Sequence, residues 1–165
     1  MASPVNALNA KNVRPFTSFN FVVLIEVKDV TNNGAQLCSA AFAECDGLEM
    51  TMEPKTIREG GRNTGPVHLA GPLSYGQLTL KRGMTNSFDL WSWFEKMYEK
   101  DQTGYRTSAT VVMRGADQSD QAVFQLTGCL PIKLKAPSLN AKDGIVAIEE
   151  IQIAYETLLL EQNKK

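Results

Sequence analysis

Residues 77–100 carry the clearest pattern of apolar and polar positions in the chain. The first part alternates, with Leu78 and Leu80 on one side and polar side chains on the other, which is the two-residue period of a half-buried strand. Beyond Gly83 the apolar side chains recur at steps of three and four residues, the period of an amphipathic helix. The pattern therefore predicts a strand that leads into one helix over about residues 86–100.

The predicted helix carries both tryptophans of the chain and a broad apolar stripe. Asn86 or Ser87 can cap its first turn, because side-chain oxygens of these residue types accept the free N–H groups of a helix start. We expect the helix to pack onto β-structure, since the rest of the chain reads as strands and turns. The residues expected to face the core from this helix are Phe88, Trp91 and Phe94.

Most of the remaining chain alternates with a period of two. Residues 19–27 predict a strand whose centre is buried on both faces, and Asn33-Gly34 favours a hairpin turn after it. Residues 145–160 fit either a helix stripe or a strand face, and their β-branched side chains favour the strand. Further strands are predicted over residues 36–44, 105–114, 122–128 and 130–135.

Residues 48–76 differ from their surroundings because they have many charges and few side chains for a core. Such a segment cannot bury itself, so we expect a long hairpin over about 48–76 that projects from the domain and offers open edges to another chain. Met50 and Met52 are expected on its core side. The residues expected to contact neighbouring subunits are Lys55, Arg58, Glu59, Gly60, Gly61, Arg62 and Asn63.

Together these elements predict a mainly β fold: an antiparallel sandwich or small barrel with one flanking helix and a projecting hairpin. The 165 residues suit one domain with its own core. Residues 1–15 are polar and contain prolines, so we expect a flexible N-terminal arm. The single domain is expected over residues 16–162.

Composition excludes several classes of protein. A net charge of −1 lacks the basic excess of a nucleic-acid binder, and no apolar run approaches the roughly 20 residues of a membrane span. The N-terminal residues contain no apolar signal core. Cys38, Cys45 and Cys129 form no CxxC pair and are expected to be free thiols of a reducing compartment, so we expect synthesis in a cytoplasm.

No pattern in the chain supports an enzyme. His68 is the single histidine, which excludes a His-based triad or a multi-histidine metal site within one chain. The loop 60–65 has the glycine spacing of a phosphate loop, but Pro66 stands where the lysine belongs. Glu149 and Glu150 are expected on the solvated faces of a strand. We therefore expect no catalytic residue, no cofactor and no metal.

Several short motifs occur in an order that resembles a known family. They are Asp46–Met50, Ile57–Asn63, Leu80–Thr85 with Leu90–Trp93, and Ile148–Glu156 near the end of the chain. Over most of residues 19–160 the chain is similar to the tail tube proteins of contractile phage tails. It also resembles the inner-tube proteins of phage-tail-like extracellular contractile injection systems and R-type bacteriocins.

The resemblance implies an assembly. Six copies would form a ring, the rings would stack into a hollow tube inside a contractile sheath, and the hairpins of all six subunits would join into a barrel around the lumen. Implied partners are the chain itself, the sheath, baseplate and end-cap proteins, and a cargo in the lumen that is DNA or a protein effector. No specific nucleic-acid sequence and no membrane span are implied.

The resemblance also implies assembly in a bacterial or archaeal cytoplasm and a place in a phage tail or a released injection particle. A secreted ring protein of the type VI kind and a monomeric β-sandwich that binds a ligand are the alternatives. A lumen for macromolecules needs a polar wall, because exposed apolar patches would bind the cargo. The side chains expected on that wall are Glu49, Thr51, Glu53, Gln77, Thr79 and Lys81, with Lys133 and Lys135 as a rival polar face.

Overall fold

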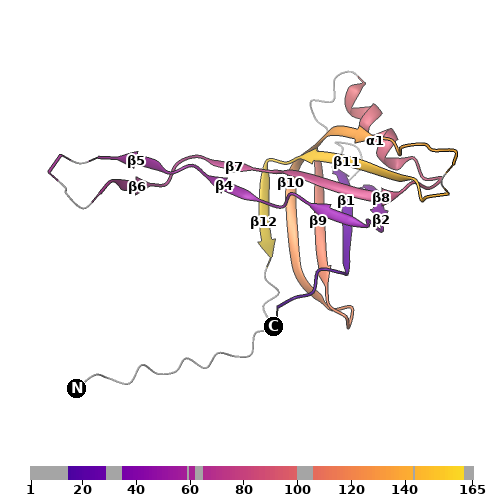
Figure 1. Ribbon diagram of the computed structural model, residues 1–165, viewed down its shortest axis with the longest axis horizontal. Helices are drawn as coiled ribbons and strands as arrows, with labels where there is room; N and C mark the ends of the chain where they lie inside the picture. Colours follow the sequence, from indigo (N-terminus) through magenta and orange to yellow (C-terminus); the bar gives the residue numbers. More distant parts are fainter. Residues whose placement is uncertain are drawn as a thin grey trace.

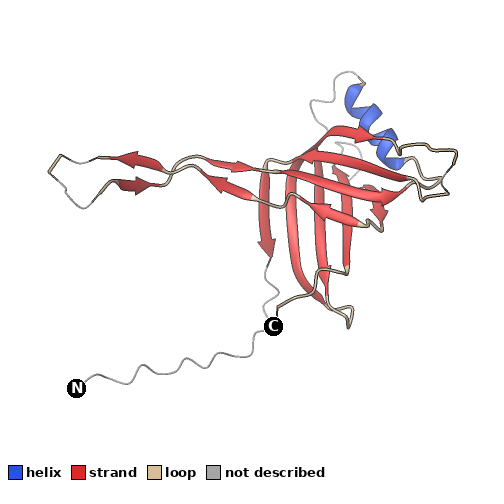
Figure 2. Cartoon of the chain, in the orientation of Figure 1, coloured by secondary structure: helices blue, strands red, loops and turns tan. Residues whose placement is uncertain are grey.

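Two antiparallel sheets that share one long strand form the body of the molecule (Figures 1 and 2). The computed structural model describes residues 15–28, 35–58, 60–61, 65–99, 106–142 and 144–161. Sheet A consists of β2 (Ala35–Ala40), β1 (Phe21–Lys28), β9 (Arg106–Arg114), β10 (Asp120–Lys135) and β12 (Thr157–Glu161). Sheet B consists of β10, β11 (Ile148–Ala154), β8 (Gln77–Gly83) and β3 (Glu44–Asp46).

The shared strand β10 is one element of 16 residues, whereas the sequence predicts two strands. Gly128 has a φ of +63°, and the pairing of β10 with β9 shifts between Leu126 and Cys129. A glycine adopts this conformation without steric cost, and a bulge of this kind bends a strand. The first part of β10 therefore pairs within sheet A, and its last part pairs with β11 in sheet B.

The core lies between the two sheets and is closed by α1 (Asp89–Tyr98). The predicted helix is confirmed, but its predicted core face is wrong. Leu90 and Trp93 are buried, while Phe88 precedes the helix and is 56% exposed. Trp91 and Phe94 are only partly buried. The apolar stripe is broad enough to fit two orientations, and the helix packs through the one centred on Trp93. Neither Asn86 nor Ser87 is its cap, because Phe88 holds that position without a side-chain bond.

The predicted hairpin projects far from both sheets (Figure 1). It is two strands wide, with β4 (Met50–Met52) paired to β7 (Leu73–Tyr75) and β5 (Lys55–Ile57) paired to β6 (Val67–Leu69). Met50 and Met52 are 57% and 51% exposed, so the expectation that they face the core is wrong. The physical reason is that the hairpin carries them beyond the edge of the body, where the chain offers nothing to pack against.

The predicted mainly β class is confirmed, and the strand path is open rather than a closed barrel. Residues 145–160 contain two strands, β11 and β12, and no helix. The expected return strand over 36–44 is divided, because β2 lies in sheet A and β3 lies in sheet B. The Asn33-Gly34 turn and residues 1–14 lie outside the described residues, so the arm over 1–15 and the domain over 16–162 stay predictions. Within the described ranges, no helix is long and apolar enough to cross a membrane.

Candidate assembly surfaces

Sheet B has one polar face and one buried face. Its buried face carries Leu78, Leu80, Ile151 and Ile153, which are inaccessible to solvent. Directly paired residues of antiparallel strands point to the same face, so the pairing of β3, β8, β11 and β10 defines the opposite, polar face. One of its cross-strand rows consists of Glu44, Lys81, Glu150 and Lys135, and the next consists of Asp46, Thr79, Gln152 and Lys133.

Two sets of residues that the sequence analysis gives as alternative lumen walls lie together on this polar face. The residues expected on the lumen wall from β8 are Gln77, Thr79 and Lys81, and all three lie on it. Lys133 and Lys135 lie on the same face, because β11 joins β8 to the last part of β10. Lys81 also donates a hydrogen bond of 2.6 Å to Glu44, and this bond with the charge of Glu44 raises the pKa of Lys81.

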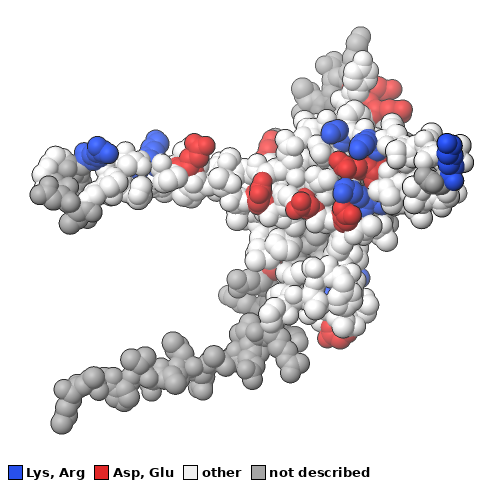
Figure 3. Space-filling model, viewed as in Figure 1, with Lys and Arg blue, Asp and Glu red and all other residues white. Residues whose placement is uncertain are grey.

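Charge is distributed unevenly across the polar face (Figure 3). Acidic Glu44 and Asp46 lie on β3, at one edge of sheet B, and basic Lys133 and Lys135 lie on β10, at the other edge. Among the strands that the structure describes, β3 pairs only with β8, and residues 130–135 pair only with β11. Sheet B thus ends in two unpaired edges of opposite charge.

Tyr155 fixes the root of the hairpin to the body. Its hydroxyl lies 2.8 Å from the carbonyl oxygen of Gly47 and 3.1 Å from that of Glu49, and it accepts the amide N–H of Glu49 at 3.1 Å. Its ring packs against Tyr75 with the centroids 5.7 Å apart. Tyr155 is buried, so both hairpin strands leave the body at a rigid point.

The two faces of the hairpin differ in polarity near its root. The pairs Met50–Tyr75 and Met52–Leu73 place apolar side chains on one face, and the pair Thr51–Ser74 lies on the other. Glu49 and Glu53, expected on the lumen wall with Thr51, are also exposed. We name the first surface, consisting of Met50, Met52 and Leu73, the apolar face of the hairpin.

Four of the residues predicted to contact other subunits lie on the outer half of the hairpin. Lys55, Arg58, Gly60 and Gly61 are exposed there. The other three, Glu59, Arg62 and Asn63, lie outside the described residues. The contacts themselves stay predictions.

A buried cluster of charges joins sheet B to the helix, and the sequence interpretation missed it. Arg82 is 4% exposed and donates hydrogen bonds to Asp89 of α1 and, at 2.6 Å, to Glu149 of β11. Glu149 is 1% exposed and also accepts the indole N–H of Trp91 at 3.1 Å. The expectation that Glu149 is solvated is therefore wrong. Its position on the same side of β11 as Ile151 and Ile153 was the signal that it points inward.

The thiols of the three cysteines are not activated for reaction. Burial raises the pKa of Cys38 and Cys129 to about 12 and that of Cys45 to about 11, so these thiols stay protonated at neutral pH. No group of three or more His, Cys, Asp or Glu side chains suited to a metal ion occurs in the described part of the chain.

The chain belongs to the T4-like virus tail tube protein gp19 family, which matches residues 17–159. Proteins of this family are structural tube proteins, so the prediction of a non-enzyme is confirmed. No curated protein matches the sequence.

Several solved structures have a similar fold. A chain of the 6-fold symmetrised anti-feeding prophage baseplate is 23% identical, with a TM-score of 0.78 over 92% of this chain and 99% of that one. A chain of the sheath-tube complex of an extracellular contractile injection system, PVC, is 17% identical, with a TM-score of 0.72 over 90% and 92% of the two chains. The Hcp1 protein from the E. coli EAEC 042 pathovar is 12% identical, with a TM-score of 0.51 over 87% and 92%.

Proposed function

We propose that copies of this chain form six-membered rings that stack into the hollow inner tube of a contractile tail or injection particle, through which DNA or a protein effector passes. The observation that carries this proposal is sheet B, with its two unpaired edges of opposite charge and its continuous polar face. Six-fold symmetry in the baseplate that contains a similar chain supports the number of copies.

The two edges suit each other when one copy stands beside the next. The β3 edge of one copy can pair with the last part of β10 in its neighbour, because each edge offers free backbone N–H and C=O groups. Acidic Glu44 and Asp46 then approach basic Lys133 and Lys135, which favours one order of strands and one register. A contact between two different edges repeats head to tail and closes into a ring.

The polar face of sheet B then forms the wall of the lumen. Its charged side chains are three acidic and three basic residues: Glu44, Asp46, Glu150, Lys81, Lys133 and Lys135. A wall whose charges balance holds neither an acidic nor a basic cargo strongly, so the cargo can move. In this arrangement sheet B makes most of the barrel, and the hairpins with Lys55 and Arg58 contact neighbouring subunits.

The partners proposed for the tube are a sheath, a baseplate and a terminating cap. Chains of similar fold occur in a sheath-tube complex, a baseplate and a tube-terminating cap. Assembly takes place in a bacterial or archaeal cytoplasm, before the tail or particle is complete.

Charge-reversal substitutions at the two edges of sheet B test the proposed contact between neighbouring copies. Lys133→Asp should raise the protein concentration needed for rings by about tenfold, because each interface gains a repulsion of about 1.4 kcal/mol. Asp46→Lys should do the same, and the double variant should recover rings because positions 46 and 133 again carry opposite charges. Lys96→Asp, on the exposed side of α1, is the matched control. Rings that form equally well in both single variants, seen by negative-stain microscopy and sedimentation, would refute the proposed edge contact.

A further inference from the structure

The chain turns from β3 into the hairpin at the dipeptide Asp46-Gly47. The turn requires glycine, because Gly47 has a φ of +90° and a Cβ atom on it would lie 1.9 Å from the carbonyl oxygen of Gln77. The proposed contact between copies uses the acidic side chain of Asp46 against the lysines of its neighbour. Two separate requirements therefore place an aspartate directly before a glycine.

The turn holds two groups that can react with each other close together. The N–H of Gly47 donates a hydrogen bond of 2.8 Å to Oδ1 of Asp46, so the amide nitrogen lies beside the carboxyl carbon Cγ. The pairing of β3 with β8 ends at Asp46–Thr79, and the N–H of Gly47 lies beyond this ladder. Asp46 is exposed, so water reaches both groups. Such proximity favours a reaction within the chain.

We infer that Asp46-Gly47 is a site of isoaspartate formation and that copies modified there no longer enter rings. In the first step the nitrogen of Gly47 forms a bond to Cγ of Asp46, and the hydroxyl of the protonated carboxyl group leaves with the amide proton as water. The product is a five-membered succinimide. Glycine favours this step, because it has no side chain to hinder the approach of its nitrogen.

The second step consumes the water that the first releases. Water adds to the backbone carbonyl carbon of Asp46 in the succinimide and breaks the bond from that carbon to the nitrogen. The chain then continues through Cγ, and the former backbone carbonyl becomes a free carboxylic acid that ionises. No atom is gained or lost overall, so the isomer has the mass of the original chain.

The isomer has a longer backbone and a shorter side chain at the end of β3. One methylene group enters the main chain before Gly47, and the carboxylate is attached directly to Cα. Gly47 would be displaced from Tyr155, whose hydroxyl bonds its carbonyl oxygen at 2.8 Å. The carboxylate would withdraw from the polar face, where the proposed contact places it near Lys133. The loss of rings rests on the proposed function, whereas the reaction rests on the turn alone.

The proposed ring protects the same site. There the free edge of β3 pairs with residues 133–135 of the neighbouring copy, and strands paired on both edges open less often than an edge strand. Closure of the succinimide requires the main chain of Asp46 to rotate, which this pairing opposes. The reaction therefore removes copies that stay unassembled and spares those in tubes.

Peptide mapping of aged protein tests the reaction. Free chain, kept below the concentration at which rings form, and assembled tubes are incubated for weeks near neutral pH. Cleavage after glutamate releases residues 45–49, in which isoaspartate changes the retention time and not the mass. The free chain should accumulate the isomer about tenfold faster than the tubes, because its edge strand opens more often.

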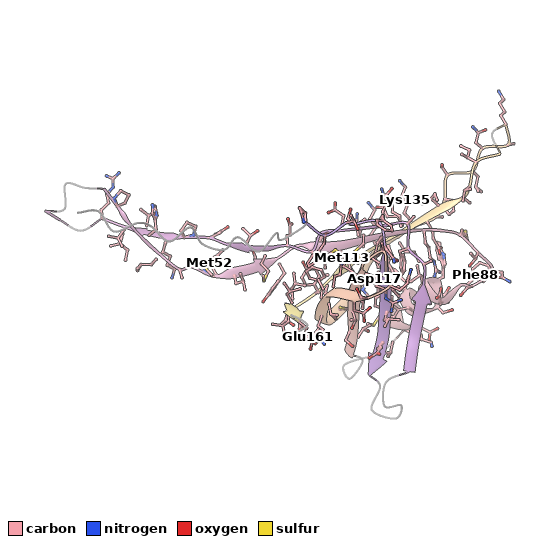
Figure 4. The ribbon with its side chains drawn as sticks, turned by 90° about the horizontal axis from the view of Figure 1, so that it is seen from below. Met52, Phe88, Met113, Asp117, Lys135 and Glu161 are labelled. Atoms are coloured by element: carbon pink, nitrogen blue, oxygen red, sulfur yellow. The ribbon has the colours of Figure 1, made fainter. Side chains whose placement is uncertain are left out.

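Asp117 is a control within the same protein. It is exposed in a turn but precedes Gln118, and trypsin releases it in residues 115–133. Figure 4 shows Asp117 on the body, away from Met52 of the hairpin. Asp117 should stay unmodified while Asp46 reacts, because the next residue has a side chain. Equal reaction of the two aspartates would overturn the assignment to this turn.

Separation of rings from free chain in an aged sample tests the consequence. The isomer at Asp46 should remain in the free fraction, and modified chains that enter rings as readily as unmodified ones would overturn the inference. An Asp46 that stays unmodified after Asn33, which precedes Gly34, has deamidated would also overturn it, as would equal rates in free chain and tubes. Failure of fresh chain to form rings would refute the proposed function, while the isomer would still form in the free chain.

Discussion

Arg82 connects sheet B, the helix and sheet A at a single point. Its guanidinium also lies 3.4 Å from the sulfur of Cys38 on β2 and 5.8 Å from the centre of the Phe42 ring. Burial alone would lower the pKa of Arg82, but the bonds with Asp89 and Glu149 raise it, so the group stays charged. A buried cation whose partners come from different elements fixes how those elements are oriented, because another arrangement would leave it unpaired.

Removal of one charge from this cluster should destabilise the subunit strongly. Glu149→Gln should lower the free energy of unfolding by about 3–5 kcal/mol, since it breaks a buried ion pair and weakens the acceptor for Trp91. Glu150→Gln changes the next residue, which points to the polar face, and should stay within about 0.5 kcal/mol. Urea unfolding monitored by tryptophan fluorescence measures both values. Equal stabilities would mean that Arg82 finds a new partner when Glu149 loses its charge.

The same cluster predicts a loss of stability in acid. Burial alone would raise the pKa of Asp89, but hydrogen bonds from Arg82 and Cys38 and the charge of Arg82 lower it overall from its ordinary value of 3.8. The stabilisation is therefore complete above pH 3.8 and is lost as the pH falls through the lower pKa of the folded state. Urea unfolding at a series of pH values should show a decline below pH 3.8 that is shallower in Asp89→Asn. Parallel curves for the two proteins would contradict this assignment.

For single residues, the sequence predicts the alternation of side chains along a strand better than it predicts which helix or charged side chains are buried. Leu78 and Leu80 face the core as their alternation predicts. The choice between Phe88 and Trp93 on one broad stripe was not decidable, because it depends on which sheet the helix meets. The exposure of Glu149 was predicted wrongly for a related reason. Its partner Arg82 lies 67 residues away in the sequence, and the pattern within one strand does not show which residues of another strand lie beside it.

Among the elements, the hairpin depends on a close approach of its two strands halfway along. A Cβ atom on Gly71 would lie 1.7 Å from the carbonyl oxygen of Glu53, so only glycine fits. The register also changes by one residue there, between Met52–Leu73 and Lys55–Leu69. This crossing point separates the two short ladders of the hairpin and sets the twist between them.

Gly71→Ala should separate the hairpin strands while the body stays folded. The added methyl group clashes with backbone and not with a side chain that can move. Hydrogen exchange of the amides in β4 to β7 should become faster, and exchange in sheets A and B should not change. Gly60→Ala is the control, because nothing lies within 4 Å of its Cβ position. Unchanged exchange in the Gly71→Ala hairpin would mean that the strands can shift to admit the methyl group.

The helix, the hairpin and most strands were predictable because each has a local periodicity. The continuity of β10 was not, because Gly128 and Pro131 are both signals that end a strand in most sequences. Its passage from sheet A to sheet B depends on partners from β9, β11 and β12, which come from three other parts of the chain.

For the whole molecule, the sequence predicts the class of protein but does not show which residues from different strands share one surface. The expected lumen residues and the rival lysines became one surface only when the register of β8, β11 and β10 was known. Long-range pairing, which no single stretch records, determines this surface.

The position of the polar face in a tube can be measured with thiol reagents. In a chain without its own cysteines, Thr79→Cys should react in assembled tubes with a small maleimide and resist one attached to a bulky polymer, because the lumen opens only at the tube ends. Ser92→Cys, on the exposed side of α1, should react with both reagents. Rapid labelling of Thr79→Cys by the bulky reagent would place the polar face on the outside of the tube.

The direct connection between the hairpin and β8 has a mechanical consequence. Only Gly76 separates β7 from β8, and β8 pairs with β11 from Gln77–Ala154 to Gly83–Ile148. Antiparallel hydrogen bonds lie perpendicular to their strands, so a force along the hairpin loads this whole ladder in shear. Bonds loaded in shear share the force and must fail together, whereas peeling breaks them one at a time. When a contracting sheath drives the proposed tube forward, each subunit would pass the thrust to the next along the direction in which its sheet is strongest.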